Sequence, residues 1–224
     1  MSQLTNRFRA LSENLCQLLE QEGLVVRPYH LASLPFFQAL TPEEQLPAIE
    51  YLERYYNLCL HTKKQRGDLR EGRVLIEEAL DYFKLEVDPA VFDLIGPRNV
   101  FEFYSPNQTQ YFRTINFFKY TSYTIEDIYS RSWFHLYERD EKITSRILEL
   151  ALQVLEGKTS SFLVPEIPEH MLTERASLEK LKVPVQIICL APLKRDGKTV
   201  GILCVVRSGG LDIERQEELE SSDS

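Results

Sequence analysis

The sequence of 224 residues lacks the patterns that mark metal, phosphate and nucleophile sites. Its four cysteines form no C-x-x-C pair, and none lies at zinc-ligand spacing from one of the four histidines. There is no glycine-rich phosphate loop, no G-x-S-x-G nucleophile motif and no H-E-x-x-H zinc motif. We therefore expect no metal site, no catalytic residues and a non-enzymatic protein.

Long apolar runs and an excess of positive charge are missing as well. No stretch approaches 18 apolar residues, and the N-terminus lacks the charged-then-apolar run of a signal peptide. The 34 acidic residues outnumber the 26 basic ones, whereas binding to duplex nucleic acid needs dense positive charge. The sequence predicts a cytoplasmic protein with reduced thiols that binds neither a membrane nor nucleic acid.

Aromatic side chains, in contrast, are concentrated in one window of the chain. Thirteen of the 24 Phe, Tyr and Trp residues lie between positions 101 and 137. Such a concentration is typical of a densely packed core or of a ligand pocket, whose walls are mostly apolar. Both interpretations stay open at this point.

The first half of the chain has the periodicity of helices. Apolar residues recur at spacings of three and four from Leu4 to Leu19, and Thr41 to Glu44 form a capping box. A polar break is expected from His61 to Gly67. The first predicted helix therefore ends at about Gly23. The second and third are predicted from Pro42 to Leu60 and from Asp68 to Phe83, and a short fourth helix is predicted to start at Asp88-Pro89. Residues 1–97 are expected to be all-helical.

The second half switches to strand patterns. The expected strands are Val100–Tyr104, Thr109–Ile115, Ser160–Val164, Val185–Leu193 and Lys198–Arg207. Asp196-Gly197 predicts a hairpin turn between the last two, which are apolar on both faces and so should be central strands. A helix is expected from Glu141 to Glu156. This order predicts an α+β fold with a five-stranded antiparallel sheet and inserted helices. Residues 208–224 form an acidic tail.

The order of elements and the segment Phe118-Lys-Tyr-Thr-Ser-Tyr-Thr-Ile-Glu-Asp-Ile128 resemble a PAS domain. In that family an Asn ends the second strand, and an aromatic residue, a Thr-Gly-Tyr-like turn and an acidic pair follow. Asn116, Tyr123 and the pair Glu126-Asp127 fit those places, although Ser122 replaces the usual Gly. The resemblance covers residues 98–207 and leaves 1–97 as an unassigned helical extension.

The resemblance implies a ligand pocket between the sheet and the aromatic segment. The candidate pocket residues are Phe118, Tyr123, Trp133, Phe134, Phe162 and Cys204. The sequence requires no cofactor, but haem stays open, with His135 or His170 as its ligand. Flavin also stays open, although the Asn-Cys-Arg motif of light-sensing relatives is absent. A redox pair of Cys189 and Cys204 is a minor alternative.

The expected function is that of a non-enzymatic, cytoplasmic signal-transduction module. It would sense a small apolar or aromatic ligand, bind a protein partner or form a homodimer, with the helical half setting dimerisation or output. One alternative is the sensory half of a transcription regulator whose output domain is not in this chain. Another alternative is a redox sensor that binds haem or flavin.

Overall fold

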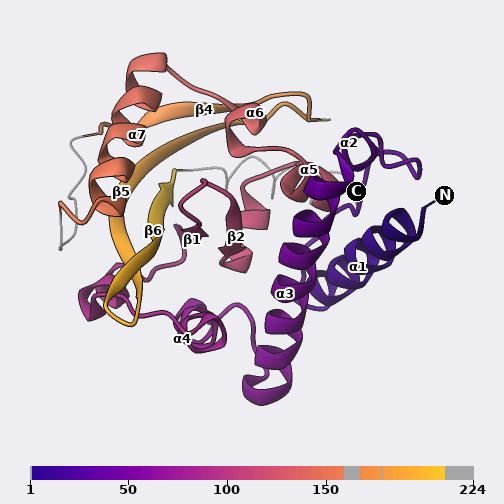
Figure 1. Ribbon diagram of the computed structural model, residues 1–224, viewed down its shortest axis with the longest axis horizontal. Coiled ribbons are helices and arrows are strands. Elements are labelled where there is room, and N and C mark those ends of the chain that lie inside the picture. The colour runs from indigo at the N-terminus through magenta and orange to yellow at the C-terminus, as the bar shows by residue number, and fades with distance from the viewer. Residues whose placement is uncertain (1, 159–166, 178, 210–224) are drawn as a thin grey trace, which may run out of the picture.

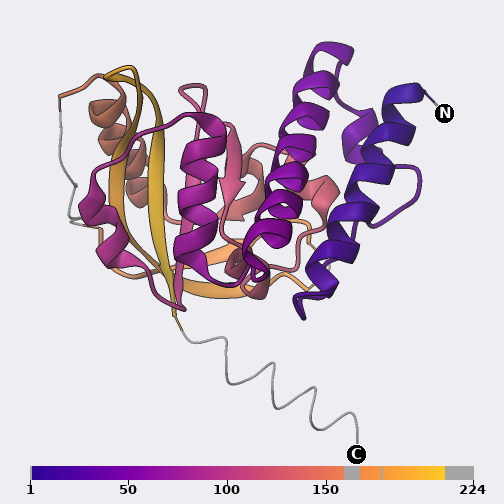
Figure 2. The ribbon, with the colours of Figure 1, turned by 90° about the horizontal axis from the view of Figure 1, so that it is seen from below.

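The computed structural model describes residues 2–158, 167–177 and 179–209. A group of N-terminal helices lies beside a curled antiparallel sheet, which a further helix covers from the opposite side (Figures 1 and 2). The N-terminal elements are α1 (Gln3–Glu20), α2 (Pro35–Gln38), α3 (Pro42–Arg66), α4 (Gly72–Phe83) and the 3-10 helix η1 (Pro89–Leu94). Among the described residues, no helix is long and apolar enough to cross a membrane.

The N-terminal helices follow the expected order with different ends. The predicted capping box of α3 is confirmed, since the Glu44 carboxylate accepts a hydrogen bond from the Thr41 N–H at 2.9 Å. The predicted break after Leu60 is wrong, because the helix continues to Arg66: Thr62 is buried, while Lys63 and Arg66 pair with Glu22 and Glu78. Helix α4 begins at Gly72 rather than Asp68.

The sheet has six strands, so the expectation of five is wrong. The strands are β1 (Asn99–Tyr104), β2 (Gln110–Arg113), β3 (Tyr137–Glu138), β4 (His170–Glu174), β5 (Lys182–Arg195) and β6 (Lys198–Ser208), and they lie in the order β2-β1-β6-β5-β4-β3. Two of these strands were not expected, namely β4 and β3, whose two residues pair with Glu174 and Thr173 of β4. The predicted α+β class and the final hairpin are confirmed, whereas the strand expected at 160–164 lies outside the described residues.

Helices are inserted between the strands as expected. The aromatic segment between β2 and β3 forms the 3-10 helix η2 (Ile115–Lys119) and the short helices α5 (Ile125–Ser130) and α6 (Trp133–Leu136). Helix α7 (Glu141–Leu155) connects β3 to β4 and confirms the helix predicted in this range. Its N-terminus is capped by Asp140, whose carboxylate accepts hydrogen bonds from two backbone N–H groups.

Both faces of the central strands are covered, as their apolar sequence predicts. On one face, Phe103, Cys189 and Leu203 belong to a core that they share with side chains of α1, α3 and α4. On the other face, Leu190 and Cys204 pack with α7. Because the core contains residues from both halves of the chain, the division at residue 97 does not appear as a break in packing and stays a prediction.

The acidic pair Glu126-Asp127 ties the N-terminal region to α5. The Glu126 carboxylate accepts hydrogen bonds from the backbone N–H groups of Phe36 and Phe37, at 2.8 and 3.1 Å. Asp127 lies 2.8 Å from His30 Nε2 and 2.9 Å from an Arg131 nitrogen. Both acids lie in the first turn of α5 and are fully buried, so their charges are compensated within the fold.

We predict that Asp127→Asn lowers the free energy of unfolding by about 3 kcal/mol, because it leaves the Arg131 cation without its carboxylate in a buried setting. Urea unfolding measures this loss. The matched control is Asp81→Asn, since Asp81 is 81% exposed and pairs with Lys84 at 3.2 Å. The control should change stability by less than about 0.5 kcal/mol. Equal losses in the two variants would contradict the role given to the buried carboxylate.

Candidate functional site

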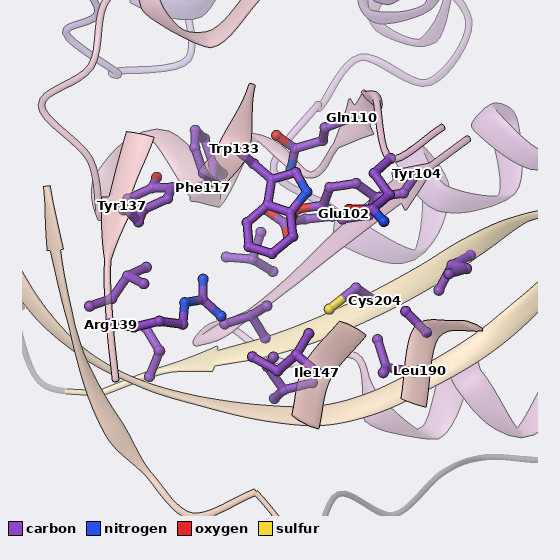
Figure 3. A pocket seen from close by; sticks show the side chains of 18 of the residues that line it. Glu102, Tyr104, Gln110, Phe117, Trp133, Tyr137, Arg139, Ile147, Leu190 and Cys204 are labelled. Atoms are coloured by element: carbon purple, nitrogen blue, oxygen red, sulfur yellow. Dashed lines mark hydrogen bonds between the residues drawn. The ribbon is translucent and has the colours of Figure 1, made fainter. Parts of the chain in front are cut away.

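A cavity of about 130 Å³ lies between the sheet, α7 and the aromatic segment (Figure 3). Strands β1, β5 and β6 form one wall, while the aromatic segment and α7 form the other. The lining of the cavity is mostly aliphatic or aromatic, and it includes Glu102, Tyr104, Phe117, Trp133, Arg139, Cys204 and Ser208. The cavity therefore lies where the resemblance to a PAS domain implied a pocket.

The alternation of strand side chains determines which residues reach the cavity. Glu102 and Tyr104 of β1 point into it, whereas Phe103 between them belongs to the core on the opposite face. Strand β1 approaches β6 closely at Gly201, where an added Cβ would lie 2.5 Å from the Tyr104 carbonyl oxygen. The absence of a side chain at Gly201 therefore sets the position of this wall.

Glu102 and Arg113 place opposite charges beside the cavity. They are cross-strand partners on β1 and β2, and Glu102 accepts a hydrogen bond from the Tyr104 hydroxyl at 3.0 Å. Burial raises the pKa of the Glu102 carboxyl, and the positive charge of Arg113 acts in the opposite direction. Glu102 is therefore a buried acid whose charged form is stabilised mainly by the positive charge of Arg113.

Arg113 is itself fully buried among aromatic rings. Its guanidinium carbon lies 5.0 Å from the centre of the Phe117 ring and 5.3 Å from that of Tyr129, distances at which a cation is attracted to a ring. Within the described ranges, none of its three guanidinium nitrogens has a hydrogen-bond partner. The ring faces and the Glu102 carboxyl are thus the groups that offset the cost of its burial.

Arg139 extends into the cavity from the end of β3 (Figure 3). Its guanidinium carbon lies 5.4 Å from the centre of the Trp133 ring. Burial lowers the pKa of this guanidinium, although an arginine in a protein stays protonated near neutral pH. In the part of the chain that the structure describes, no carboxylate lies within ion-pair distance of Arg139.

Two of the six predicted pocket residues line the cavity, namely Trp133 and Cys204. Phe118 and Tyr123 are buried outside its lining, where the Phe118 ring meets that of Phe117 and the Tyr123 hydroxyl donates to the Leu136 carbonyl. The neighbour Phe117 reaches the cavity in place of Phe118, because consecutive residues of η2 point in different directions. Phe162 and the side chain of Phe134 lie outside the described part of the chain.

The candidate haem ligands do not reach the cavity. His135 is exposed beside the Ser132 hydroxyl, and His170 donates from Nδ1 to the Pro168 carbonyl at 3.0 Å. Pockets for drug-sized ligands occupy about 300–1,000 Å³. Haem and flavin are therefore too large for this cavity, and the described residues hold no cluster of three metal-ligating side chains.

The two strand cysteines cannot form the redox pair considered above. Cys189 lies opposite Val205, and Cys204 lies opposite Leu190. Cys189 faces the core shared with the N-terminal helices, while Cys204 faces α7 and the cavity, so their Cβ atoms point away from each other. Burial raises the pKa of both thiols, to about 12 for Cys189, which leaves them as weak nucleophiles.

Trp133 separates the cavity from a second, more polar cleft of about 600 Å³. This cleft lies between α3, the loop from β1 to β2, and the helices α5 and α6. Gln108, Gln110 and Trp133 line both spaces. The cleft and the cavity therefore adjoin at these three side chains.

Sequence patterns missed the charged residues of the site. Glu102 and Arg113 lie within otherwise apolar strand segments, and Arg139 directly precedes the cap of α7. A lone acid among the aromatic residues of the expected strand Val100–Tyr104 was the available signal, because such a charge must be compensated within the fold once it is buried.

Comparisons with known proteins give matches among solved structures alone. No protein-family model matches the sequence. No curated protein is similar to it. A solved structure from the study "Flavin Analogue Sheds Light on Light-Oxygen-Voltage Domain Mechanism" aligns with 65% of this chain and 98% of its own, at 17% identity and a TM-score of 0.39. At this level of similarity, the match does not establish a shared fold or ligand.

We predict that Gly201→Ala lowers the free energy of unfolding by about 1–3 kcal/mol, because the new Cβ would force β1 and β6 apart. The matched control is Gly72→Ala, where an added Cβ would lie 3.8 Å from Ile95. Alanine in this helix should leave stability unchanged or raise it by up to about 1 kcal/mol. Urea unfolding of both variants checks the difference, and an unchanged stability in Gly201→Ala would be inconsistent with the close approach.

Proposed function

We propose that this protein is a non-enzymatic sensory domain that binds a small molecule in the cavity above Cys204. The observation that carries this proposal is the cavity itself, whose walls are mostly apolar and include a few polar groups. Natural ligand pockets have this composition. The resemblance of residues 98–207 to a PAS domain supports a role in signalling rather than in catalysis.

The size of the cavity supports a ligand of about one ring. An engineered apolar cavity of about 150 Å³ in another protein binds benzene. The cavity of about 130 Å³ beside Trp133 is similar in volume and is lined by aromatic faces that can pack on a ring. A small aromatic or branched aliphatic molecule fits this space.

Strands β1 and β2 offer a path from the cavity to the N-terminal helices. Their cavity-facing residues alternate with Phe103 and Phe112, whose rings lie 4.4 Å apart on the opposite face. The Tyr55 hydroxyl of α3 donates to the Arg113 carbonyl at 2.9 Å, and its ring lies 6.2 Å from that of Phe112. A ligand that binds more tightly to one position of these strands would favour that position and thereby shift α3. In this way a bound ligand changes the populations of two packings of the strands against α3.

We predict that Cys204→Phe weakens ligand binding at least about tenfold, because the larger ring fills the space that a ligand would occupy. The matched control is Met171→Phe on strand β4 of the same sheet, where Met171 is 50% exposed. Binding is measured by NMR titration with two single-ring probes, benzyl alcohol and benzoate. Failure of the wild-type protein to bind either probe would overturn the proposal, as would equal binding by Cys204→Phe.

We also predict that saturation with a bound probe changes the hydrogen exchange of α3 amides near Tyr55. In Tyr55→Phe, which lacks the hydroxyl that donates to β2, this response should shrink while the affinity for the probe is retained. Hydrogen exchange followed by mass spectrometry provides the measurement. A probe that binds tightly without any change in α3 would contradict the proposed path.

A further inference from the structure

The lining of the cavity has a charge imbalance. Among the described residues that line it, Glu102 is the only carboxylate and Arg139 the only cation. Arg113 adds a second positive charge beside Glu102, as its cross-strand neighbour. The site therefore contains two guanidinium groups and one carboxyl.

Glu102 interacts with neighbours other than Arg139. It accepts the Tyr104 hydroxyl and lies opposite Arg113, whose positive charge acts on it more strongly than that of Arg139. No ion pair joins Glu102 to Arg139 in the described part of the chain. Within those residues, Arg139 therefore has Glu102 only as a more distant opposite charge.

The guanidinium of Arg139 is suited to bind an anionic group of a ligand. A partly buried guanidinium that lacks a carboxylate carries a free-energy cost, which an anionic partner would remove. Its planar fork donates two parallel hydrogen bonds to the two oxygens of a carboxylate. Trp133 packs over this guanidinium, and aliphatic side chains such as Ile147 and Leu190 lie across the cavity from it (Figure 3).

We propose that the ligand of this cavity is a small monocarboxylate with an aromatic or branched apolar body, held through its carboxylate by Arg139. One negative charge matches the single net positive charge of Arg113, Arg139 and the Glu102 carboxylate, whereas a second would be buried without a partner. The apolar body would lie against the aliphatic and aromatic walls. This inference rests on the proposed function and adds the chemical class of the ligand.

The test compares benzoate with benzyl alcohol, which share a ring and differ in the carboxylate. NMR titrations at neutral pH are made with the wild type and with Arg139→Gln, Arg139→Lys and Arg54→Gln. Arg54 serves as the control because its side chain is 50% exposed and pairs with Glu50 on the surface of α3. The wild type should bind benzoate at least about tenfold more tightly than benzyl alcohol, the ratio expected from charge-assisted hydrogen bonds.

In Arg139→Gln this preference for benzoate should disappear, while the affinity for benzyl alcohol stays within about twofold of the wild-type value. Arg139→Lys should keep part of the preference, because it retains the charge but loses the planar fork. Arg54→Gln should behave as the wild type. The loss of a cooperative thermal transition would show that Arg139→Gln does not fold. The inference is then tested by the preference for benzoate in Arg139→Lys, which should be smaller than in the wild type.

Two results would overturn the inference. The first is a wild-type protein that binds benzyl alcohol as tightly as benzoate, and the second is a preference for benzoate that survives in Arg139→Gln. In both cases a ring still binds, so the proposed ligand-binding function would stand while the carboxylate assignment fails. Binding of neither probe would overturn the function and the inference together.

Discussion

The hairpin of β5 and β6 is apolar on both faces, and the rest of the structure follows from the need to cover both. On one face, α1, α3 and α4 form a core with Phe103, Cys189 and Leu203. On the other face, α7 packs against Leu190 and Cys204. The covering of this second face is incomplete, because α7 and the aromatic segment meet the curled sheet without filling the space between them. The cavity is the volume that these layers leave.

The electrostatics of the site add a second constraint to this packing. The fold buries two guanidinium groups near one another and provides one carboxyl between them. Arg113 is accommodated by the faces of Phe117 and Tyr129 and by its cross-strand neighbour Glu102. Arg139 has the Trp133 ring but no carboxylate among the described residues. Since one carboxyl cannot balance two cations, an anionic ligand would complete the balance, and its apolar body would fill the remaining space.

Local patterns predicted those elements that local chemistry determines. The Asp196-Gly197 turn, the capping box of α3 and the helix after Asp140 depend on residues close in sequence, and all three were found. Strand β3 could not be predicted, since two residues become a strand only through their pairing with β4. The residues that line the cavity depend on the direction of each side chain. The prediction was therefore wrong by one residue, since Phe117 lines the cavity and Phe118 does not. The lack of an ion pair at Arg139 among the described residues depends on tertiary structure, which no local pattern encodes.

The most direct test of the central claim is a crystal structure of the protein grown with benzoate. The account predicts a ring in the cavity between Trp133 and the aliphatic wall, with both carboxylate oxygens about 2.7–2.9 Å from the Arg139 guanidinium nitrogens. Cys204 would lie beside the ring on the sheet side. A cavity that holds no benzoate, or an Arg139 that pairs with a carboxylate of its own chain, would contradict the account.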